Sequence, residues 1–356
     1  MPPLLRFIIY RLISVPITLF VITAILYGVV MLTPAETRAT LYLPKRLPSR
    51  LTEEQYQKLI QIRIEKYHLN DPYPVQYAYW ISSLLQGTWG YSPIMQTDVL
   101  TALLLRTPAT AELTIFSLLL FIPLGLISGV IAGGRQNKTT DHQFRLTAFV
   151  ATSLPPFILA LLLLSVFYVS LYWFPPERIS LSNSFLINSD NFRSYTGLIT
   201  LDGLLNGRPD ISLDAARHLV LPVITLSLVH WATLGRVTRA AMIEELHKEY
   251  ITAARARGIK ERQVIWRHAF RNILAPALTT STLSAATLVT GVYVVEIIFN
   301  FHGISELAVR SMNTIPDAPA ALGFALYSVI AVLMMMFALD IFQAILDPRI
   351  REGAIA

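Results

Sequence analysis

Six long stretches without a charged residue constrain this chain more than any other feature of its sequence. Each stretch contains no Asp, Glu, Lys or Arg over at least about 18 residues, and a helix needs roughly 20 residues to cross the hydrocarbon of a bilayer. Hydrophobic residues make up 54% of the sequence, and only 15% of residues are charged. We therefore predict an all-α integral membrane protein with six transmembrane helices. The stretches are Leu12–Ala35, Leu113–Gly134, Leu146–Pro176, His218–Gly235, Asn272–Val295 and Ala318–Leu339.

The Lys and Arg residues beside these stretches predict the orientation of the chain. Loops that carry an excess of Lys and Arg stay in the cytoplasm. The densest group lies between Arg236 and Arg271, and the same side receives Arg6, Arg11 and the residues near Arg351. Both termini are therefore expected in the cytoplasm. The first apolar stretch is longer than the 7–15 residues of a signal-peptide core, so we expect it to remain as a membrane anchor.

Several kinds of chemistry have no counterpart in the sequence. It contains no Gly-x-x-x-x-Gly-Lys-Ser/Thr phosphate loop, no His-Glu-x-x-His and no cysteine. The net charge of +6 sits in membrane loops without the aromatic and basic pattern of a nucleic-acid site. Acids and histidines are scarce within the spans, which disfavours a carrier driven by a proton relay. We expect no cofactor and no metal in this chain, and no nucleic-acid partner.

Residues 250–276, which we call the basic segment, read YITAARARGIKERQVIWRHAFRNILAP. Residues 251–257 favour a helix, and Gly258 falls where a left-handed helix end is needed. A second helix is predicted from Ile259, with Pro276 one turn into the next span. The alanines leave a surface low enough for another protein to dock closely. Charge alone, however, is also explained by the retention of positive loops in the cytoplasm.

The order of residues in the basic segment resembles the EAA coupling loop of ABC-importer permeases, and most closely the branch that moves peptides, nickel and related solutes. The matching pattern is Ala-Ala-x-Ala-x-Gly, followed by Arg-His-Ala-x-Arg-Asn-x-x-x-Pro, with Thr252 where the broader motif has glutamate. Similar signatures occur at 70–92, at 106–113 and at 346–351, whereas 34–37 and 302–305 depart from the family pattern. The resemblance implies that the residues contacting an ATPase are Tyr250, Ala253, Ala254, Arg255, Ala256, Arg257, Gly258, Arg267, His268, Arg271, Asn272 and Pro276.

The resemblance also implies a fold and partners. The expected architecture is the type I ABC importer permease fold in a bacterial or archaeal cytoplasmic membrane. The expected partners are a sister permease subunit, two cytoplasmic ATPases that bind ATP and Mg, an extracytoplasmic binding protein and the lipid bilayer. Di- or oligopeptides are the leading substrates, and nickel chelates, glutathione and oligosaccharides remain alternatives. A membrane scaffold or receptor that transports nothing, and a secondary carrier, are the alternatives from other classes.

The predicted organisation has four parts. Residues 1–35 form transmembrane helix 1, residues 36–107 an extracytoplasmic helical insertion, and residues 352–356 a cytoplasmic tail. Residues 108–351 form the permease core with helices 2–6, including the coupling loop at 239–272. In the insertion, Thr52 and Gln55 have the spacing of a capping box that opens a helix. Tyr77, Tyr79 and Trp80 favour the lipid–water interface, with contact to an outside partner as the alternative.

A few single residues have open interpretations. Glu296 is either part of the transport pathway or an end-of-helix acid solvated at the interface. Structural roles are predicted for Asp340 within the bundle, and for Asp347 and Arg349 at the cytoplasmic surface. His218 and His230 are expected to pack rather than to bind metal, and Pro155-Pro156 predicts a kink in the third span.

Overall fold

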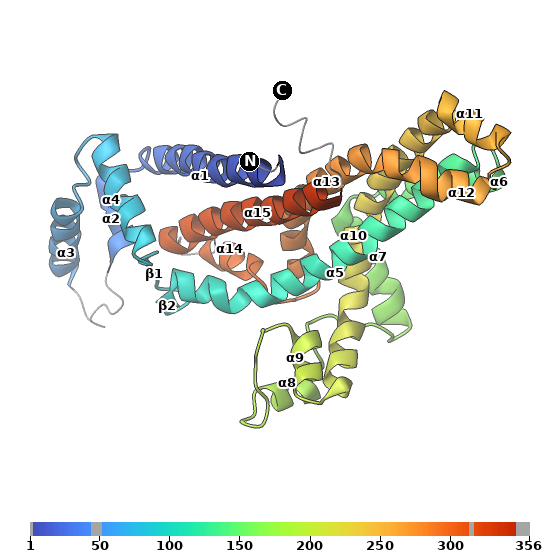
Figure 1. Cartoon of the computed structure of the whole chain (residues 1–356). Coiled ribbons are helices and arrows are strands. Elements are labelled where there is room, and N and C mark those ends of the chain that lie inside the picture. Colours follow the sequence, from blue (N-terminus) through green and yellow to red (C-terminus); the bar gives the residue numbers. More distant parts are fainter. Residues whose placement is uncertain (1–2, 44–51, 313–316, 347–356) are drawn as a thin grey trace. The chain divides into compact units, whose positions relative to one another are not determined.

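The structure is a computed structural model that describes residues 3–43, 52–312 and 317–346, and these residues are mostly helical (Figure 1). They belong to two compact units, one built mainly from residues 108–303 and one from residues 9–107 and 304–334. The α-helices are α1 (Pro3–Val30), α2 (Ala35–Ala39), α3 (Glu53–Lys66), α4 (Tyr73–Leu85), α5 (Val99–Gly134), α6 (Thr139–Ser153), α7 (Pro156–Leu163), α8 (Leu181–Ile187), α9 (Ile199–Leu205), α10 (Pro209–Leu246), α11 (Glu249–Ala256), α12 (Glu261–Gln263), α13 (Phe270–Ile298), α14 (Ser305–Ser311) and α15 (Ala318–Leu346). The remaining elements are the 3₁₀ turn η1 (Thr40–Tyr42), the π-helical η2 (Leu164–Ser170) and η3 (Val264–Ala269), and the antiparallel strands β1 (Tyr91–Ser92) and β2 (Thr97–Asp98).

The number of spans agrees with the prediction. Five helices within the described residues are long and apolar enough to cross a membrane, and the pair formed by 139–153 and 156–170 supplies a sixth if it is one bent span. This pair bends by 99° at the predicted kink, because Pro155 and Pro156 lack the N–H groups that a continuous helix needs. The first span is displaced from its predicted limits, since α1 begins at Pro3 and ends at Val30.

Three glycines bring α5 and α10 into close contact in the larger unit. A Cβ added at Gly129 would lie 2.6 Å from the carbonyl oxygen of Gly235 and 2.6 Å from Cβ of Thr238. A Cβ at Gly133 would lie 2.7 Å from Cβ of Met242, and Gly125 lies equally close to α10 one turn away. Small residues at this spacing allow helices to approach closely within a bilayer, where van der Waals packing drives association.

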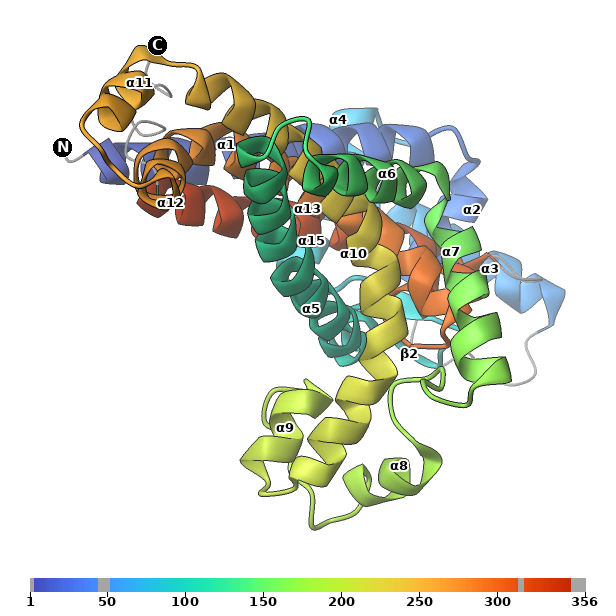
Figure 2. The same ribbon diagram turned by 90° about the vertical axis from the view of Figure 1, so that its right-hand side faces the viewer.

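Helix α10 organises the larger unit. Leu219 and Leu226 of α10 are buried with Phe121 of α5 and with Leu288 and Val292 of α13 in one hydrophobic core. Both views place α8 and α9 at one end of α10 and α11 at its other end (Figures 1 and 2). The uncharged stretch predicted at 218–235 is only the middle of this 38-residue helix. Arg217 and Arg236 bound that stretch, but the helix continues beyond both of them.

The smaller unit contains the elements between the first two spans. The capping box of α3 is present: the side chain of Thr52 accepts from the N–H of Gln55, and the side chain of Gln55 accepts from the N–H of Thr52. The interfacial placement predicted for Tyr77 and Trp80 is wrong, because both side chains are buried. Trp80 stacks on Tyr27 of α1 at a ring-centroid distance of 5.0 Å, so aromatic packing within the unit takes the place of lipid.

Candidate functional site: the basic segment and the opposite end of α10

The turn after α11 has the geometry predicted for it. Gly258 has φ +77°, its N–H bonds to the carbonyl of Arg255 at 2.9 Å, and the N–H of Ile259 bonds to the carbonyl of Ala254 at 3.3 Å. This pair of bonds is the Schellman motif, which ends a helix in the left-handed conformation. A Cβ added at Gly258 would meet no atom within 4 Å. The backbone conformation, rather than lack of space, therefore favours glycine here.

An apolar cluster attaches the basic segment to the helix bundle. Ile251 and Ala254 of α11 are buried against Val130 of α5, Met242 of α10 and Ile273 of α13. The hydrophobic face of α11 is thus covered by three other helices, which turns a short helix of marginal intrinsic stability into a fixed part of the bundle. Movement of α11 must therefore displace these helices or break this packing.

A buried carboxylate, which the sequence analysis did not single out, joins both ends of the basic segment. Glu245, in the last turn of α10, accepts hydrogen bonds from the hydroxyl of Tyr250 and from Nδ2 of Asn272, the latter at 2.7 Å. Nζ of Lys248 lies 2.6 Å from its other oxygen. Two residues predicted from the motif thus meet on one acid. The sequence pattern that indicates this carboxylate is the three-residue spacing of Glu245 and Lys248, which places the two side chains on one face of a helix.

The predicted coupling residues differ in how far they face outward. Arg255 forms a two-bonded pair with Glu261 across the glycine turn, with its shorter bond at 2.7 Å, and both side chains are exposed. Ala254 is buried, and His268 and Asn272 are half-buried. The remaining predicted residues, all exposed, are Tyr250, Ala253, Ala256, Arg257, Gly258, Arg267, Arg271 and Pro276. Arg267 and His268 lie on the π-helical turn η3, a conformation often found at functional sites.

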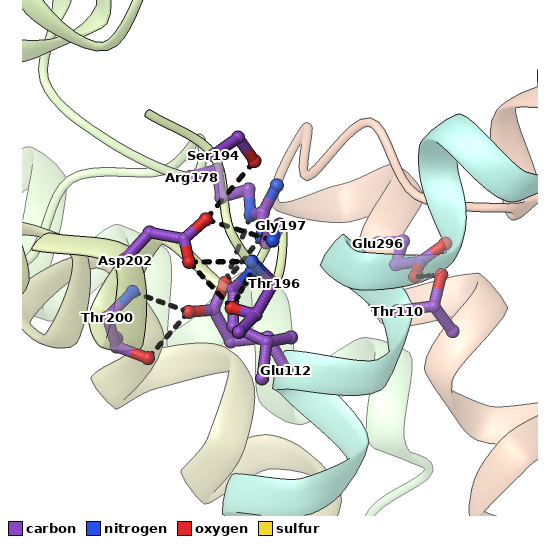
Figure 3. A network of polar contacts seen from close by, with 10 residues as sticks. Thr110, Glu112, Arg178, Ser194, Thr196, Gly197, Thr200, Asp202 and Glu296 are labelled. Carbon is purple, nitrogen blue, oxygen red and sulfur yellow. Dashed lines mark hydrogen bonds and ion pairs between the residues drawn. The ribbon is translucent and has the colours of Figure 1, made fainter. Parts of the chain in front are cut away.

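At the opposite end of α10 lies a second polar centre, the Glu112 network (Figure 3). Glu112 of α5 is 1% exposed. One of its oxygens accepts from Nε and Nη2 of Arg178 at 3.1 and 2.7 Å, and the other accepts from the N–H and hydroxyl of Thr200 at 2.8 and 2.7 Å. Nη2 of Arg178 also bonds to the carbonyl of Gly197 at 2.7 Å. The network fastens the loop between residues 174 and 217 to α5.

Asp202 of α9 extends the Glu112 network. Its carboxylate accepts from the N–H and hydroxyl of Thr196 at 2.9 and 2.7 Å, from the N–H of Gly197 at 2.9 Å and from the hydroxyl of Ser194 at 3.1 Å. Burial alone would raise the pKa of Asp202, but these hydrogen bonds to the ionised form outweigh burial and hold the pKa below its usual value. This network was not predicted from the sequence. Its residues are spread over 90 positions, and the fold brings them together.

Glu296 lies on the other side of α5 from Glu112 (Figure 3). It is 1% exposed, and its carboxylate accepts a hydrogen bond from the hydroxyl of Thr110. A Cβ added at Gly303 would lie 2.1 to 2.5 Å from the carboxylate atoms, so any larger residue there would displace the Glu296 carboxylate. The interpretation of Glu296 as an acid solvated at the interface is therefore wrong. A place in the transport pathway stays a prediction.

The other singled-out residues fall outside both centres. Asp340 is buried in α15, whereas Asp347 and Arg349 lie outside the described residues. His218 has a carboxylate neighbour that the sequence analysis overlooked, since its Nε2 is 3.6 Å from Asp214 one turn earlier on α10. Its Nδ1 lies 2.9 Å from the carbonyl oxygen of Pro176, as expected for a packed histidine.

His230 packs on the ring of Phe121 with centroids 5.5 Å apart. Among the residues that the structure describes, no group of three or more His, Cys, Asp or Glu could hold a metal ion.

Comparison with known proteins defines the class of this chain. Residues 121–352 match the family model of the binding-protein-dependent transport system inner membrane component. This match covers well over half of the chain, which therefore belongs to that family of membrane permease components. The predicted resemblance to permeases is confirmed.

Two relatives match nearly the whole chain. The di/tripeptide transport system permease protein DppB of Pseudomonas aeruginosa (strain UCBPP-PA14) is 31% identical, over 98% of this chain and 99% of the relative. The oligopeptide transport system permease protein AppB of Bacillus subtilis (strain 168) is 32% identical, over 95% and 96%. Among solved structures, an inward-facing MetNI methionine ABC transporter chain is 15% identical, with a TM-score of 0.46 over 70% of this chain and 96% of that chain.

Proposed function

We propose that this chain is the permease subunit of an ATP-driven importer for di-, tri- or oligopeptides and forms half of the translocation pathway. The peptide substrate is supported by the names of the two full-length relatives. In this proposal, ATP hydrolysis takes place in two separate cytoplasmic ATPase subunits, and an extracytoplasmic binding protein delivers the substrate to this chain and a sister permease subunit. Both termini and the basic segment face the cytoplasm.

The observation that carries the proposal is the construction of the basic segment. Its exposed face is formed by small and cationic side chains, including Ala253, Ala256 and Arg257. Another protein can dock on this face. Its inner face is packed on α5, α10 and α13. The contacts of Glu245 with Tyr250 and Asn272 tie the end of α10 to the start of α13.

This construction suggests how ATPase movement reaches the pathway. Closure of the ATPase pair on ATP would displace α11, and the packing of α11 would transmit the displacement to α10 and α13 as rigid elements. The two permease subunits would then rock between inward-open and outward-open states, which is an alternating-access step. The chain itself supplies the coupling surface and the pathway walls.

The test uses the complex purified in mild detergent from its native membrane. We expect an ATPase pair and a second six-span protein to copurify, and we expect substrate-stimulated ATPase activity to be lost when Ala253 and Ala256 are both replaced by Trp. The matched control is Asn191→Trp, an equally bulky change at an exposed site near the other end of α10. Recovery of the chain alone, or full stimulation in the double variant, would contradict the proposal.

A further inference from the structure

A basic pocket between α6 and α10 has no role in the proposed coupling. It is lined by His142, Arg145, Leu146, Phe149, Arg236 and Arg239, and its volume of about 560 Å³ lies in the range of small-ligand cavities. Figure 2 shows α6 lying across α10 toward the end that leads to α11. We call this site the α6–α10 pocket.

Of the three arginines that line the α6–α10 pocket, only Arg239 forms an ion pair with a carboxylate among the described residues. Arg239 is already engaged, because it forms a two-bonded pair with the fully buried carboxylate of Asp141, with Nη2 at 2.8 Å. Asp141 also accepts the N–H of Asn137 at 3.0 Å. Arg145 and Arg236 are both exposed, and none of the described residues that line the pocket is a carboxylate. Arg145 and Arg236 therefore line a hollow that can accept an anion.

The apolar side chains beside these cations indicate what kind of anion fits. Leu146 and Phe149 line the same pocket and are 65% and 67% exposed, and Val150 next to them is 52% exposed. A free phosphate would gain nothing from these side chains. A phospholipid would place its acyl chain on the apolar face of α6 and its phosphodiester between the arginines, which bind such oxygens through paired N–H donors.

We propose that the α6–α10 pocket binds the headgroup of an anionic phospholipid. Arg145 and Arg236 bind its phosphate, and Leu146 and Phe149 contact one of its acyl chains. Basic pockets between membrane helices, at the ends near the positively charged loops, are suited to such headgroups. The Asp141–Arg239 pair joins α6 to α10, the two helices that carry Arg145 and Arg236. This site is independent of the proposed transport function.

The experiment reconstitutes the whole chain in nanodiscs that contain equal amounts of phosphatidylglycerol and phosphatidylcholine, and counts retained lipids by native mass spectrometry after extraction. We expect phosphatidylglycerol to be retained over phosphatidylcholine. Arg145→Gln with Arg236→Gln should weaken that retention by about tenfold or more, given the typical attraction of a surface cation for anionic lipid. The control is Lys58→Gln with Arg193→Gln, which removes the same charge at exposed positions that do not line the pocket.

Two further variants keep the proposal open to refutation. The double variant Arg145→Lys with Arg236→Lys keeps the charge but loses the paired N–H donors, so it should retain an intermediate amount of lipid. Such partial retention would show that the lost binding in the Gln variant is not caused by misfolding. Phe149→Ser should lower lipid retention and leave the binding of inorganic phosphate unchanged. Equal retention of the two lipids, or identical behaviour of the two Gln double variants, would overturn the proposal. Inorganic phosphate that binds through both arginines without any lipid enrichment would also overturn it, in favour of a free-anion site.

Discussion

The two ends of α10 each hold a buried carboxylate but use it differently. Glu112 has both oxygens bonded by groups from a loop that is distant in sequence, and the loop carries further bonds of its own through Asp202. Glu245 binds Tyr250 and Asn272 of the basic segment and Lys248 just before it, and the outer face of that segment stays exposed. The Glu112 end is therefore built to be fixed in place, whereas the basic-segment end presents a surface while remaining attached to the bundle. If this comparison is right, single substitutions should cost more stability at the Glu112 end.

The largest effect is expected for Glu112→Gln. Removal of one partner leaves the charge of Arg178 largely buried without its counterion, which destabilises a protein by about 3 kcal/mol. The measurement is the thermal unfolding midpoint in detergent, followed by size-exclusion chromatography. The control is Glu177→Gln, which is next to Arg178 but exposed and should shift the midpoint little. Equal shifts for the two variants would break the comparison.

The next effect is expected for Asp202→Ala, at about 2 kcal/mol, because several donors of one loop lose a charged acceptor that is itself buried. The same residue predicts a pH dependence. Because the folded pKa of Asp202 lies below its ordinary value of 3.8, its stabilisation is fully present above that pH and is lost as the pH falls through the folded pKa. The protection of residues 194–205 against hydrogen exchange, taken relative to the intrinsic rate at each pH, should therefore fall in acid in the native chain. Asp202→Asn should flatten that dependence, and an unchanged pH profile would refute the assignment.

A smaller effect is expected for Gly258→Ala at the basic-segment end. The added Cβ meets no atom, so the cost is only that of a left-handed backbone, about 1 kcal/mol. Gly258→Asn should recover part of it, because Asn adopts this conformation more readily than Ala. Hydrogen exchange at the amides of α11 measures the difference. A loss of stability as large as that of Glu112→Gln would show that this end is as rigidly fixed as the other.

The smallest effect is expected for Arg255→Gln. Its pair with Glu261 joins two exposed side chains, and such pairs contribute at most about 0.5 kcal/mol. The unfolding midpoint should hardly move, and raising the salt concentration should have little effect on it in either protein. A shift of several degrees would mean that the pair, rather than the apolar cluster beneath it, holds α11 in place.

The sequence was sufficient for features that depend on local pattern. The uncharged stretches predicted the spans, Gly258 its left-handed turn, Thr52 its capping box and Pro155 the break between α6 and α7. It was not sufficient where chain segments far apart meet. Glu112 and Thr200 are 88 positions apart, and the stacking of Trp80 on Tyr27 depends on where α4 folds back, so neither contact leaves a pattern in the nearby sequence.

The close contact of α5 with α10 at Gly235 divides α10 unequally. From this point the helix runs ~17 Å to Leu246 at the basic-segment end but ~39 Å to Pro209 at the other, at 1.5 Å per residue. A tilt about this contact makes α10 a lever whose short arm ends at the basic segment. Each ångström of displacement there would move the far end by roughly two, in the opposite direction. Under the coupling proposed above, the position of three glycines on α5 would thus set the ratio between the displacement of α10 at the basic segment and its displacement at the Glu112 end.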